Sequence, residues 1–425
     1  GVIQIPKFKK GELCAPFTIP SEHHTTGISG ADFVLYVAAG PSGGAAAWAG
    51  PCARLKNKRP IVGVMNYDPM FIDTADKSIR IVAHEIGHAL GFGFTEMSMR
   101  NIVREAFKVR GKPYVTMVTS PLVQQMVRKH YGCPDAKGME LEDEGSSGTS
   151  LSHWERRNAK DELMVGLGGN LHYTAITMAL FEDLGYYKAD FSKAETMRWG
   201  KDAGCDFLRK PCFVDGVSPY PDMFCNQLKG NKSLLCTFDR LSLGFCTLSK
   251  YVQHLPQHFQ YFKDPTLGGV GLLADFCPFV QEYVNGGCTN GEARAMLGSR
   301  IGPNSRCLKG NSLRMGTYSL GDVCVNTQCD KGTLRVQLLD DDTWYTCKEG
   351  EHITPSKVFT SGTILCPKYE EVCPEVTEDN NDAAPETSSE TRSSKGDRNR
   401  TSSEKSSRQR SYPYRWNTRR RPRIE

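Results

Sequence analysis

Sixteen cysteines constrain this 425-residue chain more than any other feature of its sequence. Thirteen of them fall between Cys205 and Cys373, and no two are spaced as a CxxC pair. Zinc ribbons and thioredoxin-type sites need such pairs, whereas an even number of dispersed cysteines is typical of disulfide-bonded proteins from an oxidising compartment. We therefore expect a disulfide-bonded protein that is secreted or exposed at the cell surface. A cytosolic protein with free thiols is the alternative.

The two ends of the chain carry further signals. The N-terminal sequence GVIQIPKFKKGE lacks the apolar core of a secretory signal, so we expect a processed or fragmentary chain. No apolar run approaches the roughly 20 residues that a transmembrane helix needs, so we expect no membrane-spanning segment. The C-terminus carries no apolar tail that could be exchanged for a GPI anchor.

The net charge of +5 comes from the end of the chain. Residues 395–425 contain eleven Lys or Arg and three Asp or Glu, so the rest of the chain is close to neutral. Within residues 375–425, the stretch 377–410 is almost free of apolar side chains, which predicts that this basic tail is disordered. Arginines interleaved with Tyr412, Tyr414 and Trp416 could contact nucleic acid or anionic lipid. A solvated tail is the preferred interpretation, and we expect no nucleic-acid partner.

We divide the remainder into three folded segments, residues 1–93, 94–204 and 205–374. The first contains two predicted strands, residues 31–39 and 61–67, both rich in apolar and β-branched or aromatic side chains. The third is dominated by Cys, Gly and Pro, which predicts a mainly irregular or β structure held by disulfides. The fold class is therefore α+β.

The pattern that carries chemistry is HEIGH, from His84 to His88. Apolar residues at three- and four-residue steps predict a helix with a buried apolar stripe. Asp73 or Thr74 can cap this helix, and Gly91 and Gly93 are its stop signals. On that helix the two histidines lie one turn apart on the same face, so both can bind one Zn²⁺. Glu85 can take a proton from a zinc-bound water that attacks a peptide carbonyl. An amphipathic helix with two surface histidines is the alternative.

A catalytic zinc ion needs a third protein ligand and one open position. The elongated metzincin motif would place a third histidine at position 94, where this chain has Phe94. The third ligand must therefore lie elsewhere. His153 is the best candidate, because Met164 follows eleven residues later, as suits the methionine turn under the zinc site of metzincins.

These motifs resemble the leishmanolysin family of surface zinc metalloproteases, which are metzincins with a long insertion before the third histidine. The resemblance covers nearly all of residues 1–374 and rests on HEIGHALGF, SHWERRNAKDELM, MALFEDLGYYKADFSKAETMRWGKDAGCDFL and the cysteine spacing. It implies a metzincin-type catalytic domain with a twisted mixed sheet and a zinc helix, followed by the Cys-rich domain. It also implies one Zn²⁺ bound by His84, His88 and His153, with Glu85 as the base and Met164 as the Met-turn methionine.

The resemblance further implies eight disulfides. They are Cys14–Cys52, Cys133–Cys205, Cys212–Cys277, Cys225–Cys246, Cys236–Cys307, Cys288–Cys324, Cys329–Cys373 and Cys347–Cys366. Two sequons, at Asn231 and Asn399, would carry glycans on a secreted chain.

The chain departs from the family pattern in ways that affect the site. We expect that it begins part-way into the N-terminal domain of the family and lacks the propeptide. After Met164 it reads VGLGG, where family members often carry Ala-Pro, so we expect a looser site floor or a wider pocket for the P1′ side chain. We expect that pocket to favour apolar residues. We also expect residues 61–67 to form an edge strand that pairs with an extended peptide substrate.

Two functions compete. The first is a zinc metalloendopeptidase that cleaves protein or peptide substrates and also takes part in cell adhesion or host interaction. The second is a catalytically idle adhesion or decoy module that keeps the protease fold. The intact HExxH motif favours the first, since folding alone does not require Glu85.

Overall fold

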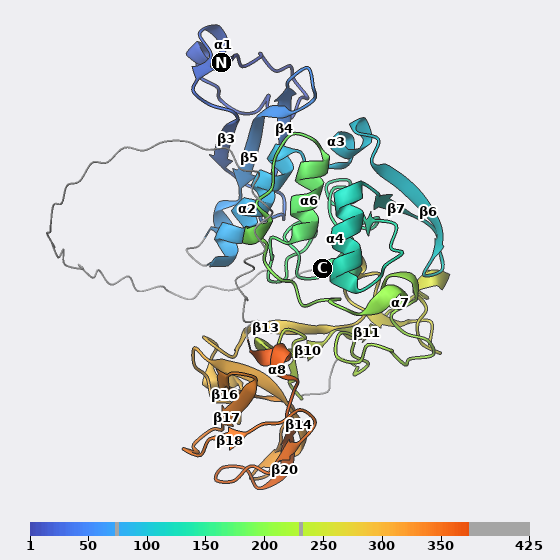
Figure 1. Cartoon of the computed structure of the whole chain (residues 1–425), viewed down its shortest axis with the longest axis vertical. Helices are drawn as coiled ribbons and strands as arrows, with labels where there is room; N and C mark the ends of the chain where they lie inside the picture. The colour runs from blue at the N-terminus through green and yellow to red at the C-terminus, as the bar shows by residue number, and fades with distance from the viewer. Residues whose placement is uncertain (73–75, 229–232, 374–425) are drawn as a thin grey trace, which may run out of the picture. The chain divides into compact units, whose positions relative to one another are not determined.

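The HExxH motif lies on α2 (Asp76–Leu90), a helix that packs against β4 and β5 of a small mixed sheet (Figure 1). The computed structural model describes residues 1–72, 76–228 and 233–373. The proposed capping residues Asp73 and Thr74, the sequons' Asn231 and Asn399, and the basic tail lie outside the described residues. The helix ends where predicted, because Gly91 has a φ of +119°, which only glycine adopts without strain.

The sheet against α2 contains three strands in the order β3 (Val34–Ala39), β5 (Pro60–Tyr67) and β4 (Ala47–Arg54). Strand β3 runs parallel to β5, and β4 runs antiparallel to it. The expectation that residues 61–67 form an edge strand is therefore wrong. β5 is the central strand and is buried along most of its length, so its backbone hydrogen bonds are already used by two neighbours.

The central part of the chain builds a second sheet and the helices beside it. Strands β6 (Val103–Val109), β7 (Lys112–Val118) and β8 (Met139–Glu140) form an antiparallel sheet. Helix α4 (Pro121–Tyr131) begins with a proline at its first position and ends at Gly132, whose φ of +61° lies in the left-handed region. It packs against α6 (Ala175–Asp183). The short helices are α1 (Ser21–Thr25), α3 (Phe94–Met99), α5 (Arg156–Ala159), α7 (Gly204–Arg209) and α8 (Tyr369–Val372).

The largest hydrophobic core joins the central segment to the start of the Cys-rich one. It runs from Phe92 to Phe279 and buries large side chains such as Trp154, Trp199 and Phe207. Two disulfides, Cys133–Cys205 and Cys212–Cys277, lie within it. Residues 1–374 belong to one contact unit. The domain boundaries that we placed at residues 93 and 204 remain predictions.

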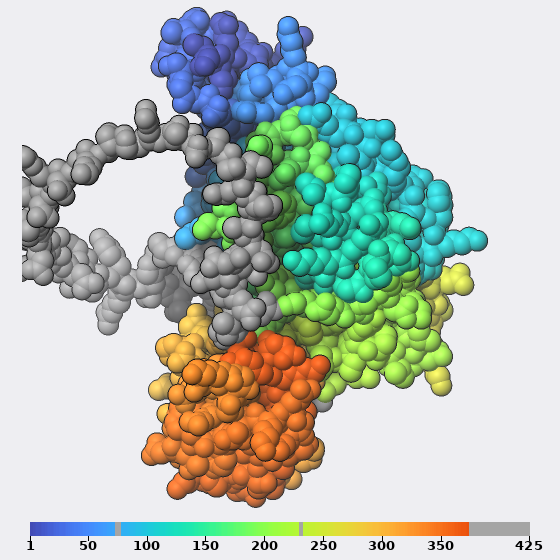
Figure 2. Space-filling view, in the orientation of Figure 1, coloured from blue at the N-terminus to red at the C-terminus, as the bar shows by residue number. Residues whose placement is uncertain are grey.

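The Cys-rich part consists mainly of short strands. The largest of its sheets lies at the end of the described chain and encloses a separate hydrophobic core of its own (orange in Figure 2). Its strands are β14 (Ser305–Met315), β15 (Tyr318–Ser319), β16 (Val323–Asp330), β17 (Thr333–Gln337), β18 (Tyr345–Thr346), β19 (His352–Ile353) and β20 (Ser361–Leu365). The smaller sheets of the Cys-rich part contain β9 (Leu235–Cys236), β10 (Ser242–Cys246), β11 (Leu248–Lys250), β12 (Leu267–Gly269) and β13 (Val280–Gly287). A separate two-stranded sheet near the N-terminus pairs β1 (Val2–Ile3) with β2 (Ile28–Ser29).

All sixteen cysteines are disulfide-bonded, and the pairs are the same eight that the family resemblance implied. Several bridges join segments far apart in sequence; Cys133 and Cys205, for example, are 72 residues apart. Such bridges restrict the unfolded chain and so stabilise strands that are too short to build a large core. Among the described residues, no helix combines the length and the apolar composition needed to cross a bilayer.

Candidate metal centre

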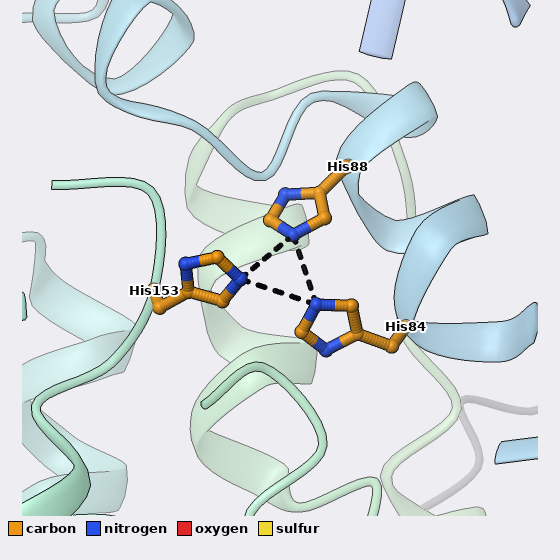
Figure 3. A group of neighbouring side chains, drawn as sticks. All are labelled: His84, His88 and His153. Atoms are coloured by element: carbon orange, nitrogen blue, oxygen red, sulfur yellow. Dashed lines mark hydrogen bonds between the residues drawn. The ribbon is translucent and has the colours of Figure 1, made fainter. Parts of the chain in front are cut away.

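Three imidazoles converge at one point, two from α2 and one from a loop that precedes α5 (Figure 3). The Nε2 atoms of His84 and His88 are 3.0 Å apart, and each lies within 3.2 Å of Nε2 of His153. His84 and His88 come together because four helical residues complete about one turn. His153 joins them through tertiary structure alone, 65 residues further along the chain.

Main-chain carbonyls orient all three rings. Nδ1 of His84 donates to the carbonyl of Leu163 at 2.6 Å, and Nδ1 of His88 donates to that of Phe92 at 2.9 Å. A carbonyl can only accept, so each Nδ1 carries the proton and each Nε2 presents a lone pair. Sequence reasoning missed these two residues because a carbonyl contributes no side-chain signal to a motif.

The third ring is held in the same way by its own loop. Nδ1 of His153 donates to the carbonyl of Thr149 at 2.9 Å. Gly166 makes this packing possible, because a Cβ at that position would lie 2.6 Å from Cγ2 of Thr149 and 3.5 Å from Cγ of His153. The space beside Gly166 is therefore filled by Thr149, and the glycine does not widen the site on this side.

The three lone pairs fit a tetrahedral cation. With no proton on any Nε2, the three nitrogens cannot hydrogen-bond to one another and would repel at about 3 Å. A zinc ion with Zn–N bonds of about 2.0–2.1 Å places its ligands about 3.3 Å apart, close to the observed separations. Burial lowers the pKa of His84, of His88 and of His153, the last to about 3, so the rings remain in the neutral form that binds metal.

Glu85 lies beside the triad with one carboxylate oxygen unused. It is 5% exposed, and its Oε2 has no hydrogen-bond partner within the described part of the chain. Burial raises the pKa of Glu85 to about 8. A pKa close to the working pH suits a group that must both take up and release a proton.

Met164 lies against α2, where it touches Gly87. A Cβ on Gly87 would approach Sδ of Met164 to 2.8 Å, so the methionine packs directly beneath the turn that joins the two helical histidines. Glu162 fixes the chain at this point: its Oε2 accepts from the main-chain N–H of Met164 at 2.5 Å, and its Oε1 accepts from the hydroxyl of Thr177 at 2.6 Å. The structure thus places Met164 against the turn of α2 between His84 and His88, and its role as a Met-turn methionine stays a prediction.

The outer face of α2 differs from expectation. The sequence predicted a buried apolar stripe, yet Ile79 is 66% exposed and Ile86 is 36% exposed. A pocket of about 390 Å³ opens on this face, lined by residues that include Ile86, Leu90, Phe181 and Tyr187. None of the three triad histidines lines it, but Leu163, the residue before Met164, does.

Comparison with known proteins gives a consistent result. A family model described as leishmanolysin (peptidase M8) matches residues 1–381. The leishmanolysin homolog of Crithidia fasciculata is 40% identical over 380 residues, which are 85% of this chain and 58% of the relative. Leishmanolysin of Leishmania major is 39% identical over 381 residues, with 85% and 63% coverage. A leishmanolysin-like peptidase of Caenorhabditis elegans is 29% identical over 447 residues. The chain spans about three fifths of the length of the trypanosomatid relatives.

Proposed function

Because the chain belongs to the leishmanolysin family of metallopeptidases, we propose that it is a zinc-dependent endopeptidase whose catalytic base is Glu85. The convergence of three Nε2 lone pairs beside an unpartnered buried carboxylate carries this proposal. His84, His88 and His153 would hold one Zn²⁺, which supplies Lewis-acid polarisation and acidifies water.

Each protein group has one task in this mechanism. The carbonyls of Phe92, Thr149 and Leu163 hold the imidazoles in the tautomer that binds metal. Glu85 accepts the proton of the attacking water and returns it to the amine that leaves when the peptide bond breaks. Because Glu85 is buried, bulk water has little access to its carboxylate. The proton that Glu85 accepts therefore comes from the attacking water.

Substrates and location complete the proposal. An endopeptidase of this kind takes extended protein or peptide segments, and we expect an apolar P1′ residue. Since β5 is central in its sheet, an extended substrate would have to pair with another strand. Eight disulfides favour an oxidising environment, so we propose that the protein acts at the cell surface or in a secreted form.

Hydrolysis of a quenched fluorescent peptide tests the proposal. The purified oxidised chain should cleave the peptide, lose the activity with a zinc chelator and regain it when Zn²⁺ is restored. A zinc-loaded chain that cleaves no member of a diverse peptide library would contradict the proposal. That outcome would favour the alternative, an idle adhesion or decoy module on the same fold.

A further inference from the structure

A second group of titratable side chains lies beside the loop that carries His153. Two chain segments pair here: the N–H of Glu142 donates to the carbonyl of His153 at 2.9 Å, and the N–H of Glu155 donates to that of Glu140 at 2.9 Å. This pairing brings the side chains of Glu142 and Glu155 together although they are distant in sequence. One carboxylate oxygen from each of Glu142, Asp143 and Glu155 lies within 4.8 Å of the other two.

Negative charge exceeds positive charge around this group. Arg110 pairs with Glu140 and Asp275, and Lys112 pairs with Asp143 and Asp275. Three of the five carboxylates gathered here, Glu140, Asp143 and Asp275, pair with these two cations. Among the described residues, the other two, Glu142 and Glu155, form an ion pair with neither cation. Buried charges without such compensation are costly, so the group needs further positive charge or protons.

The nearest arginines do not supply that charge by direct contact. Nε of Arg156 donates to the carbonyl of Leu167 at 2.9 Å. Both terminal nitrogens of Arg157 donate to main-chain carbonyls, those of Phe207 and Lys210. No ion pair joins either guanidinium to Glu142 or Glu155 within the described residues.

Glu155 provides an independent sign of a missing ligand. The residue is completely buried, and its Oε1 accepts from the N–H of Arg157 at 2.9 Å. Its Oε2 is also buried and has no hydrogen-bond partner in the part of the chain that the structure describes. A buried polar atom without a hydrogen-bond partner destabilises the folded state by about 1–3 kcal/mol, and a charged one by more.

We propose that Glu142, Asp143 and Glu155 bind one calcium ion. All three ligands are carboxylate oxygens, which suit a hard cation, whereas zinc sites use histidine or cysteine. Calcium bonds oxygen at about 2.3–2.6 Å, so two ligands of one ion are separated by at most about 5 Å, consistent with the observed spread. Magnesium demands a tighter octahedron and retains several waters.

The ion would link both paired segments and so brace the loop that holds His153. Asp143 is the most exposed of the three ligands, with 27% of its side chain accessible, and gives water access to the remaining coordination positions. This site is outside the histidine triad, and binding there does not depend on the proposed peptidase activity.

Calorimetric titration of the zinc-loaded, calcium-depleted chain with CaCl₂ tests the proposal directly. We expect one calcium ion per chain and, at calcium about 100-fold above the dissociation constant, a melting temperature about 3 °C higher. MgCl₂ should produce a clearly smaller shift. The absence of both a binding isotherm and a melting shift would overturn the proposal, whether or not the chain cleaves peptides.

A matched pair of variants separates calcium from a shared proton. Glu155→Gln should abolish the calcium-dependent shift, whereas Glu144→Gln, in the same loop but outside the group of three, should retain it. If Glu155→Gln instead melts higher than the parent chain and neither responds to calcium, the carboxylates share a proton and the proposal is wrong. Should Glu155→Gln fail to fold, Asp143→Asn, at the more exposed ligand, should still weaken calcium binding at least about tenfold.

Discussion

The region around the histidine triad and the sheet at residues 305–365 differ in how their structure is held in place. The triad rests on one large core in which segments distant in sequence meet, and its rings are oriented by main-chain carbonyls. The C-terminal sheet has a smaller core, within which Cys347, Cys366 and Cys373 are buried as parts of disulfides. The first core also contains two disulfides, Cys133–Cys205 and Cys212–Cys277. The two regions therefore differ in the size of their cores and in the carbonyl contacts that orient the triad, and both are cross-linked.

Removal of the third ligand, His153, is expected to have the largest effect on the triad region. His153→Ala should remove most of the bound zinc and lower peptidase activity about ten-thousandfold, because a cation held by two ligands loses several kcal/mol of transition-state stabilisation. Metal analysis and peptide hydrolysis provide the measurement. His172→Ala, at a histidine outside the triad, is the matched control and should retain its zinc. Full occupancy without His153 would mean that another residue is the third ligand.

Removing the base should separate chemistry from metal binding. Glu85→Gln is expected to fold, keep its zinc and lose activity about a thousandfold, since the base acts in the transition state without ligating the cation. Glu105→Gln, at an exposed position on β6, serves as the control. Near-normal turnover by Glu85→Gln would show that another group accepts the proton.

The C-terminal sheet should respond to the loss of a disulfide. Replacing Cys347 and Cys366 together with serine opens a bridge between residues 19 apart and should destabilise the sheet by about 3 kcal/mol. Zinc content and activity at low temperature should remain unchanged, because this bridge lies outside the core that carries the triad. Denaturant unfolding followed beside zinc analysis measures both. Simultaneous loss of zinc would contradict the separation of the two regions.

A single added methyl group tests how tightly the triad region is packed. Gly166→Ala would force its Cβ against Thr149, which should cost about 1–3 kcal/mol and weaken zinc binding through the displaced His153 ring. Gly168→Ala is the control, since a Cβ there meets only ordinary contacts with Leu171. Equal behaviour of the two variants would show that the loop adapts without cost.

The smallest expected effect concerns an ion pair that links α2 to the segment after α6. Arg80 donates to both carboxylate oxygens of Glu195 at 2.6 and 2.7 Å, and this lowers the pKa of Glu195 to about 2. Its contribution is therefore present above about pH 4.5 and is lost as the pH falls towards 2. Both side chains are about one third exposed, so Glu195→Gln should cost about 1 kcal/mol or less at pH 7. Urea unfolding at pH 7 and pH 3 should show the difference shrinking at low pH.

Local patterns predicted the elements that carry the site, but not all of their surroundings. The position of α2 followed from apolar spacing and from the stop signal at Gly91. Strand β5 was recognised as a strand and misplaced at an edge. Strand order depends on which segments pair, and the sequence pattern of one strand does not contain that information.

The sequence by itself determined the residues that can do chemistry. HExxH puts two imidazoles and a carboxylate on one helical turn because the helix repeat is local, and the even cysteine count indicated disulfides because thiol chemistry depends on composition and compartment. Only the tertiary structure decided which carbonyls fix the ring tautomers, that Gly166 admits Thr149 beside His153, and that Glu142 and Glu155 meet as buried acids. Those contacts join residues through space, and their energies depend on burial, which no local sequence pattern specifies.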